Sequence, residues 1–357
     1  MIRFIPIFNF SLFLSILYLV DAPYSPAYIG QLFCILLLAY RFSLSNNRLI
    51  IPIDVLFSFA IIIVLFLTFL TGSNDPGVFL NAIFTFLLYS MLRCSNLDKS
   101  EIISISKYFV VFIILITGCE TVYRITNPQY YGIISKDEAD LFFYPYKRNS
   151  FMFLDSNYTS ILILAALQVF LFDLVSVKKN RNYFLALIFL LFLTFSRASI
   201  FSFILMFIFK WLIVSKNKYK LYISCSLSLI LAILFMLIFN VSINVDDGSF
   251  LSKFSIINEL TNLLYYNFNI EMFFGLGLGA SRDIIGVGAH NILVLMLIEF
   301  GLIFTFVFVL FSFSILSIGY RYGFIFIFIF FINGFSLGFF FPFVLFPIAL
   351  RLSSDEM

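Results

Sequence analysis

Four basic side chains and the only histidine of the chain are the residues best suited to act on a substrate. They are Lys147, Arg148, Arg197, Arg282 and His290. Fixed positive charges stabilise the negative charge that develops on a phosphate or diphosphate leaving group. One arginine about 4 Å from such a charge, at an effective dielectric constant near 20, contributes on the order of 4 kcal/mol, or roughly a thousandfold in rate. These residue types can bind an anion and stabilise developing negative charge.

His290 leaves two roles open. An imidazole titrates near neutral pH, so it can accept the proton of an attacking hydroxyl group, and in its cationic form it can bind a diphosphate. Alternatively, His290 makes a structural hydrogen bond and takes no part in a reaction. One histidine and a few scattered carboxylates do not provide enough clustered ligands to coordinate a divalent metal ion. We therefore predict a metal-independent reaction that needs no cofactor.

The run 275–282 reads GLGLGASR, ends at Arg282 and precedes His290 and Asn291. Glycine backbone can approach an anion closely, which makes Gly277 a candidate for such a contact. No predicted strand precedes the run, so it does not indicate a nucleotide-binding loop. A flexible connection without a ligand is the alternative.

Membrane helices must position these residues. Of the 357 residues, 62% are hydrophobic and 11% charged, whereas a soluble domain has about 25% charged residues. Lipid offers the backbone no hydrogen bonds, so apolar runs without strand-like alternation must cross it as α-helices. Runs of spanning length cover residues 4–20, 24–40, 53–70, 77–92, 108–122, 157–175, 183–195, 200–214, 221–240 and 291–318, with one or two more in 322–350. We predict an all-α, polytopic transmembrane helix bundle of about 11 spans (roughly 10 to 12), with two longer periplasmic segments.

Basic residues orient this bundle. With a cytoplasmic N-terminus, about fourteen of the 22 lysines and arginines flank the spans on the cytoplasmic side, as the positive-inside rule requires. The chain then divides into N-terminal helices 1–122, a first outer segment 123–156, helices 157–240, a second outer segment 241–290 and C-terminal helices 291–357. Apolar residues at helical spacing predict an amphipathic helix over 251–264 in the second outer segment.

Residues 183–214 are predicted to form a helical hairpin. One continuous helix would be roughly 48 Å long against a hydrocarbon core of roughly 30 Å, and both flanks are basic, which places them on the same side. The apex is residues 196–199 on the outer face, where Arg197 reaches the depth of lipid phosphates. A membrane anchor is the alternative role for Arg197.

Charge inside the predicted spans is essentially limited to Glu120 and Glu299, without the ladder of acidic groups typical of proton-coupled transporters. Continuous α-helical geometry would place Glu299 on the opposite helix face from His290. We therefore expect Glu299 to make a structural hydrogen bond inside the bundle.

Three stretches together resemble the O-antigen polymerase and O-antigen ligase superfamily. They are residues 148–157 (RNSFMFLDSN), residues 194–198 (TFSRA), and the run that starts at 275–277 and passes through His290 and Asn291 to 299–302 (EFGL). They keep the order and the topology of that family. Lys253 departs from the pattern, since the family often has arginine there.

The resemblance implies a glycosyltransferase of the bacterial inner membrane that uses sugars linked to undecaprenyl diphosphate in lipopolysaccharide biosynthesis. The candidate catalytic residues are His290, Arg197 and Arg282, and the candidate substrate-binding residues are Lys147, Arg148, Asn157, Gly277 and Asn291. The expected partners are the lipid-linked oligosaccharide, membrane lipid and, as a further candidate, a chain-length regulator, with no nucleic acid.

Three functions remain open at this point. We favour a polymerase that joins repeat units at the periplasmic face. A ligase that transfers the polymer to lipid A-core would carry the same motifs. A polysaccharide-lipid flippase is the alternative of another class, and it should have a cationic central cavity.

Overall fold

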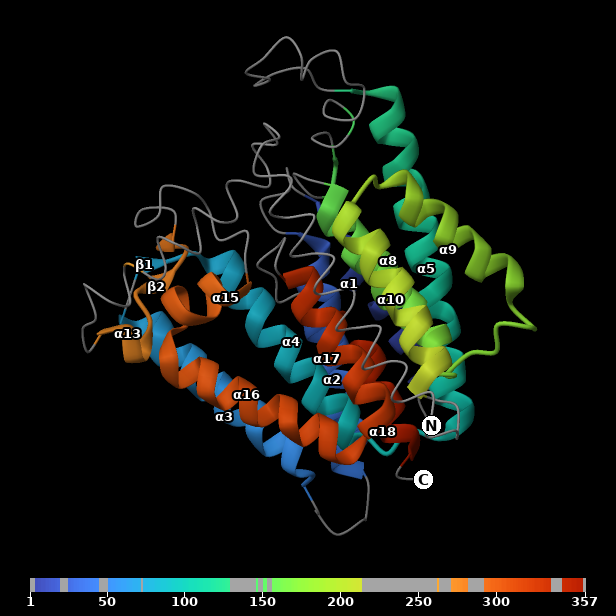
Figure 1. Cartoon of the computed structure of the whole chain (residues 1–357). Helices are drawn as coiled ribbons and strands as arrows, with labels where there is room; N and C mark the ends of the chain where they lie inside the picture. Colours follow the sequence, from blue (N-terminus) through green and yellow to red (C-terminus); the bar gives the residue numbers. More distant parts are fainter. Residues whose placement is uncertain are drawn as a thin grey trace. The chain divides into compact units, whose positions relative to one another are not determined.

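The computed structural model describes residues 4–19, 25–44, 51–71, 73–128, 146, 150–152, 156–213, 262, 271–281, 292–334 and 342–355. The described parts of the chain are helical apart from turns and one pair of two-residue strands, β1 (Ser73–Asn74) and β2 (Gly277–Leu278). Figure 1 shows the helices in chain order. They are α1 (Phe4–Ile16), α2 (Pro26–Leu44), α3 (Ile53–Thr71), α4 (Pro76–Cys94), α5 (Lys99–Thr126), α8 (Ser156–Leu171), α9 (Arg181–Leu193), α10 (Arg197–Ile213), α13 (Glu271–Phe274), α15 (Ile292–Val294), the π-helix η1 (Leu295–Glu299), α16 (Gly301–Ile318), α17 (Tyr320–Gly334) and α18 (Phe346–Asp355).

Five helices in the described ranges are long and apolar enough to cross a membrane. They are α2, α3, α4, α5 and α16. α1, α8 and α9 are apolar but shorter, with 13, 16 and 13 residues, and a 13-residue helix covers only about 20 Å. The chain is therefore an all-helical membrane protein, as its composition predicted. The predicted span 221–240 and the amphipathic helix 251–264 fall outside the described residues, apart from Asn262.

The chain forms two compact units. Unit 1 comprises Met1–Ile62, Leu80–Phe201 and Phe340–Met357, and unit 2 comprises Ile63–Phe79 and Ser202–Phe339. In unit 1, α1 packs on α2 and α5, while α5, α8 and α9 pack on one another and α18 packs on α5 and α8. The ring of Phe109 in α5 contacts Phe346 of α18, with centroids 4.7 Å apart.

Polar contacts join the helix ends that the sequence places in the cytoplasm. Arg41, near the end of α2, donates to both carboxylate oxygens of Glu101 in the first turn of α5, at 2.7 and 2.6 Å. Its guanidinium also donates to the backbone carbonyl of Ser95, which follows α4, at 3.2 Å. Ser353 of α18 donates to the carbonyl of Leu92 at 3.2 Å. Contacts at these ends agree with the predicted alternation of helix direction, and they place Arg351, which the sequence left unassigned, near the same end as Arg93.

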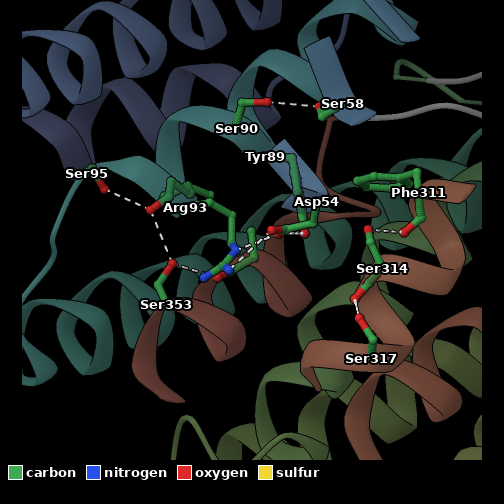
Figure 2. Close-up of polar contacts among 12 residues, drawn as sticks. Asp54, Ser58, Tyr89, Ser90, Arg93, Ser95, Phe311, Ser314, Ser317 and Ser353 are labelled. Atoms are coloured by element: carbon green, nitrogen blue, oxygen red, sulfur yellow. Dashed lines mark hydrogen bonds and ion pairs between the residues drawn. The ribbon is translucent and has the colours of Figure 1, made fainter. Parts of the chain in front are cut away.

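A buried ion pair links the start of α3 to the end of α4 (Figure 2). Arg93 Nε lies 2.8 Å from Asp54 Oδ2, and both side chains are fully buried. Tyr89 donates to the same carboxylate oxygen at 2.5 Å. Asp54, in the first turn of α3, and Arg93, in the last turn of α4, therefore compensate each other's charge inside the protein.

The C-terminal end of α1 and the N-terminal parts of α2 and α4 meet through amide and hydroxyl groups. Gln31 Nε2 donates to Tyr18 Oη at 2.6 Å and to the carbonyl of Ser15 at 3.2 Å, and Tyr18 donates to Asn81 Oδ1 at 3.3 Å. Gly30 permits this approach, since a Cβ there would lie 2.3 Å from the Ser15 nitrogen. Neutral hydrogen bonds hold these ends of α1, α2 and α4, whereas ion pairs hold the ends that carry Arg41 and Arg93.

In unit 2, two backbone segments cross in direct contact at a pair of glycines. Gly275 and Gly301 have φ angles of +89° and +87°, which L side chains rarely adopt. A Cβ on Gly275 would lie 2.2 Å from the carbonyl oxygen of Glu299, and one on Gly301 would lie 2.3 Å from the Gly275 nitrogen. Leu276 N–H donates to the carbonyl of Ile298 at 2.8 Å, which fixes the crossing.

This crossing corrects the predicted span 291–318. In the structure, α15 and the π-helical turn of η1 end at Phe300, and α16 starts anew at Gly301. The left-handed backbone of Gly301 and its contact with Gly275 interrupt the helix. The apolar run gave no local sign of the break, because its cause is a contact with a segment that is distant in sequence.

Candidate functional site

The C-terminal end of α5 carries a buried ion pair. Arg124 donates to Glu120 Oε1 from Nε at 2.9 Å and from Nη2 at 2.7 Å, and its Nη2 also donates to Thr159 Oγ1 of α8 at 2.8 Å. Ser150 donates to the same Glu120 oxygen. The other oxygen, Glu120 Oε2, is buried and has no hydrogen-bond partner among the described residues.

The length of α5 places this pair close to the membrane surface. The helix has 28 residues, about 42 Å, so its ends extend beyond a hydrocarbon core of about 30 Å. If the helix is centred in the core, Glu120 lies roughly 11 Å and Arg124 roughly 17 Å from the midplane, on either side of the hydrocarbon boundary. Since the Arg124 guanidinium reaches back to Glu120, the pair then lies at the hydrocarbon boundary.

Two of the three sequence stretches meet beside this pair. Ser156, the first residue of α8, donates to the carbonyl of Thr194 at 2.8 Å. Tyr146 donates to the carbonyl of Leu193, the last residue of α9, at 2.6 Å, and its ring meets Phe195 edge-to-face with centroids 5.4 Å apart. Burial raises the pKa of Tyr146, while the nearby charge of Arg124 opposes part of this shift. The phenol therefore remains a hydrogen-bond donor at neutral pH.

The predicted break in the helix at residues 196–199 is confirmed, with a small shift. α9 ends at Leu193, Thr194 and Phe195 form a turn, and α10 begins at Arg197. Phe195 has a φ of +52°, which reverses the backbone. Arg197 and Ser199 are thus in the first turn of α10 and not part of the connecting turn itself.

Serine hydroxyls line the contact between α8 and this turn. Ser160 and Ser199 share a hydrogen bond of 2.5 Å, and Ser196 donates to Ser199 at 3.2 Å. All three are buried. Small hydroxyl side chains let helix backbones approach closely in lipid. This contact therefore fixes the start of α10 and with it the position of the Arg197 backbone.

Arg197 is exposed at the first position of α10. A cation at a helix N-terminus faces the positive end of the helix dipole, which is unfavourable by roughly 0.3–1 kcal/mol. An anion bound between the guanidinium and the first backbone N–H groups would reverse that sign.

In unit 2, Gly277 lies in β2, buried, and pairs in parallel with Ser73 of β1. The neighbouring Gly279 N–H donates to Glu299 Oε2 at 3.0 Å, and Ser281 Oγ donates to Glu299 Oε1 at 2.5 Å. The expected structural hydrogen bond of Glu299 is therefore confirmed, and its partners lie in the glycine-rich run. Asn157, in the first turn of α8, is half-buried, and its carbonyl accepts from Ser160 at 2.5 Å.

Several predicted site residues lie outside the described residues, and their roles stay predictions. They are Lys147, Arg148, Arg282, His290 and Asn291. Within the described ranges, no group of three His, Cys, Asp or Glu side chains is placed to share a metal ion.

Sequence reasoning missed Arg124 as a candidate. Glu120 and Arg124 are four residues apart in one helix, a spacing that brings such side chains together. Two opposite charges at this spacing inside an apolar helix could have indicated the ion pair from the sequence.

A comparison of the chain with protein families, curated proteins and solved structures finds no match.

Proposed function

We propose that this protein is an O-antigen polymerase of the bacterial inner membrane, with about 11 spans, that joins oligosaccharide repeat units carried on undecaprenyl diphosphate at the periplasmic face. One observation carries most of the argument. The stretches 148–157 and 194–198, which are separate in sequence, are joined by Ser156 and Thr194 beside the Arg124 and Glu120 pair.

The chemistry requires cations at the membrane surface. The hydroxyl oxygen of the acceptor sugar forms a bond to the anomeric carbon of the donor, and the bond from that carbon to the diphosphate oxygen breaks. The hydroxyl proton passes to a base, and the lipid diphosphate leaves with the bonding electrons. Arg197 is suited to stabilise that leaving group, together with the predicted Arg282, because fixed cations act where charge develops.

His290 is the candidate to receive the hydroxyl proton, as the sequence suggested. Glu120 is fully buried and is held by Arg124 and Ser150, so we assign it the role of fixing Arg124.

The flippase alternative is less well supported. It would need cations in a central cavity, but the two buried arginines described in unit 1, Arg93 and Arg124, each pair with a carboxylate at 2.8 and 2.7 Å. Each pair is neutral overall; the first joins α3 to α4, and Arg124 of the second also contacts Thr159 of α8.

The test compares two matched arginines. Arg197 and Arg181 are both exposed first residues of helices, of α10 and α9, and the predicted topology puts Arg181 on the cytoplasmic side. In cells that lack the gene and express each variant, Arg197→Ala should abolish the O-antigen ladder and leave lipid A-core with a single repeat unit. Arg181→Ala should keep the ladder.

Other outcomes assign other functions. Bare core with polymer retained on the lipid carrier would identify a ligase. Single repeat units trapped on the cytoplasmic side would identify a flippase. An unchanged ladder with Arg197→Ala, at normal protein levels, would remove Arg197 from the reaction.

A further inference from the structure

Three exposed cations lie close together where α9 begins. This basic cluster consists of Lys178, Lys179 and Arg181, and none of the three forms an ion pair with another described residue. Residues 172–183 contain one acidic side chain, Asp173, so this stretch carries a net charge of +2. Like charges repel at short range, and a bound anion would relieve that repulsion.

The loop that carries the two lysines is held to unit 1 by its own apolar side chains. Phe172, Leu174 and Val175 are buried. The backbone N–H and the side-chain amide of Asn180 both donate to the carbonyl of Ser176, at 3.2 and 3.1 Å. The loop backbone is therefore fixed, and the lysines extend from it as exposed side chains.

An exposed apolar stripe of α9 begins directly at the basic cluster. It consists of Leu185, Phe189 and Phe192, which are all exposed. These residues follow Arg181 at steps of four, four and three residues, so they lie on the same face of the helix as Arg181. Three leucines are buried on the other side of α9, which packs on α5 and α8.

α9 is too short to hold both of its ends outside a bilayer. Its 13 residues cover about 20 Å, whereas the hydrocarbon core is about 30 Å thick. A short membrane helix is accommodated when the bilayer thins locally and when flanking lysine and arginine side chains reach the headgroups. Both adjustments bring the basic cluster beside lipid headgroups.

We propose that the basic cluster and the apolar stripe of α9 together bind an anionic phospholipid. The cluster binds the headgroup phosphate, and an acyl chain lies along the stripe. The cluster and the turn that precedes α10 are at opposite ends of α9 (Figure 1). This inference therefore goes beyond the proposed function and does not depend on it.

The test compares two pairs of lysines that carry the same charge. Lys178→Gln/Lys179→Gln removes two cations of the cluster. The control, Lys99→Gln/Lys107→Gln, removes two exposed cations of α5 that are separated by about two helical turns. The purified full chain in neutral detergent is titrated with dioleoyl phosphatidylglycerol or with zwitterionic dioleoyl phosphatidylcholine. Native mass spectrometry gives the apparent Kd of the first bound lipid.

A specific surface predicts a loss of affinity for the anionic lipid alone. A cation near anionic lipid strengthens binding by about fivefold, so the cluster variant should bind phosphatidylglycerol roughly twentyfold more weakly or worse. The control should change this Kd by less than about twofold, and phosphatidylcholine should bind all three proteins equally. About 0.5 M NaCl should weaken phosphatidylglycerol binding to the wild type, because salt screens exposed charges.

Hydrogen exchange locates the bound lipid. Phosphatidylglycerol should slow exchange in the peptide that covers residues 172–182 of the wild type, and it should not do so in the cluster variant. Glycerophosphoglycerol, the same headgroup without acyl chains, should give little protection, because it cannot use the apolar stripe. Equal protection by this soluble compound would show a site for a free anion and would overturn the assignment to a lipid.

Two other results would also overturn the proposal. One is an unchanged Kd for phosphatidylglycerol in a cluster variant whose unfolding midpoint is normal. The other is an equal loss of affinity in the control variant, since the effect would then depend on total charge. If the double variant does not fold, Lys178→Gln alone decides the question, with an expected loss of about fivefold.

Discussion

Arg124 donates two hydrogen bonds to a single oxygen of Glu120, at 2.9 and 2.7 Å. The pair lies at the C-terminal end of α5, and both residues are buried. Because Arg124 also reaches Thr159, it connects α5 to α8.

Arg124→Met should therefore lower the stability of the protein by about 3–5 kcal/mol, because it leaves a buried carboxylate without its cation. The double variant Glu120→Gln/Arg124→Met removes both charges and should recover part of the loss. Thermal unfolding in detergent, followed by circular dichroism, measures both. A double variant less stable than the single one would contradict this account of the pair.

The ion pairs Asp54–Arg93 and Arg41–Glu101 should contribute differently to the stability of the protein. Arg93→Met leaves the fully buried Asp54 carboxylate without its cation. This substitution should lower the free energy of unfolding by about 3–5 kcal/mol. Arg41 and Glu101 are partly exposed, at 24% and 17%, so solvent screens them and Arg41→Met should cost about 1 kcal/mol or less. The unfolding midpoints of the two variants show which substitution costs more stability. A larger loss of stability for Arg41→Met than for Arg93→Met would contradict this prediction.

Three glycines should respond differently to alanine. Gly275→Ala and Gly301→Ala should destabilise strongly, since each Cβ would lie within 2.3 Å of backbone atoms at a positive φ. Gly118 lies inside α5, and a Cβ added there would meet no atom of a neighbouring element within 4 Å, so Gly118→Ala should stabilise by about 0.5–1 kcal/mol. The comparison uses expression level and unfolding midpoint, and a tolerated Gly275→Ala would refute the direct crossing.

The reaction should not depend on a divalent metal. Polymer formation by the purified protein should be unchanged in EDTA, because arginine side chains are proposed to supply the positive charge. Activity that is lost in EDTA and restored by Mg²⁺ or Mn²⁺ would assign that role to a metal.

Sequence patterns predicted the helices well where the cause of the structure is local. The break between α9 and α10 followed from the length of the apolar run and its two basic flanks, and the structure places it at Thr194–Ser196. The break before α16 was missed because Gly275, which causes it, is distant in sequence. Asp54 and Arg93 were missed as a pair for the same reason, since nothing local indicates which helix ends will meet.

Unit 1 is completed by a segment that is synthesised late. α18 packs on α5 and α8, and its Ser353 donates to the carbonyl of Leu92, yet the stretch Ser202–Phe339 of unit 2 separates α18 from the rest of unit 1 in the chain. At about 5–20 residues per second, the ribosome needs roughly 7–30 s to translate the intervening stretch. Throughout that interval Phe109 lacks its partner Phe346, so the insertion machinery or a chaperone has time to act on an unfinished α5 surface.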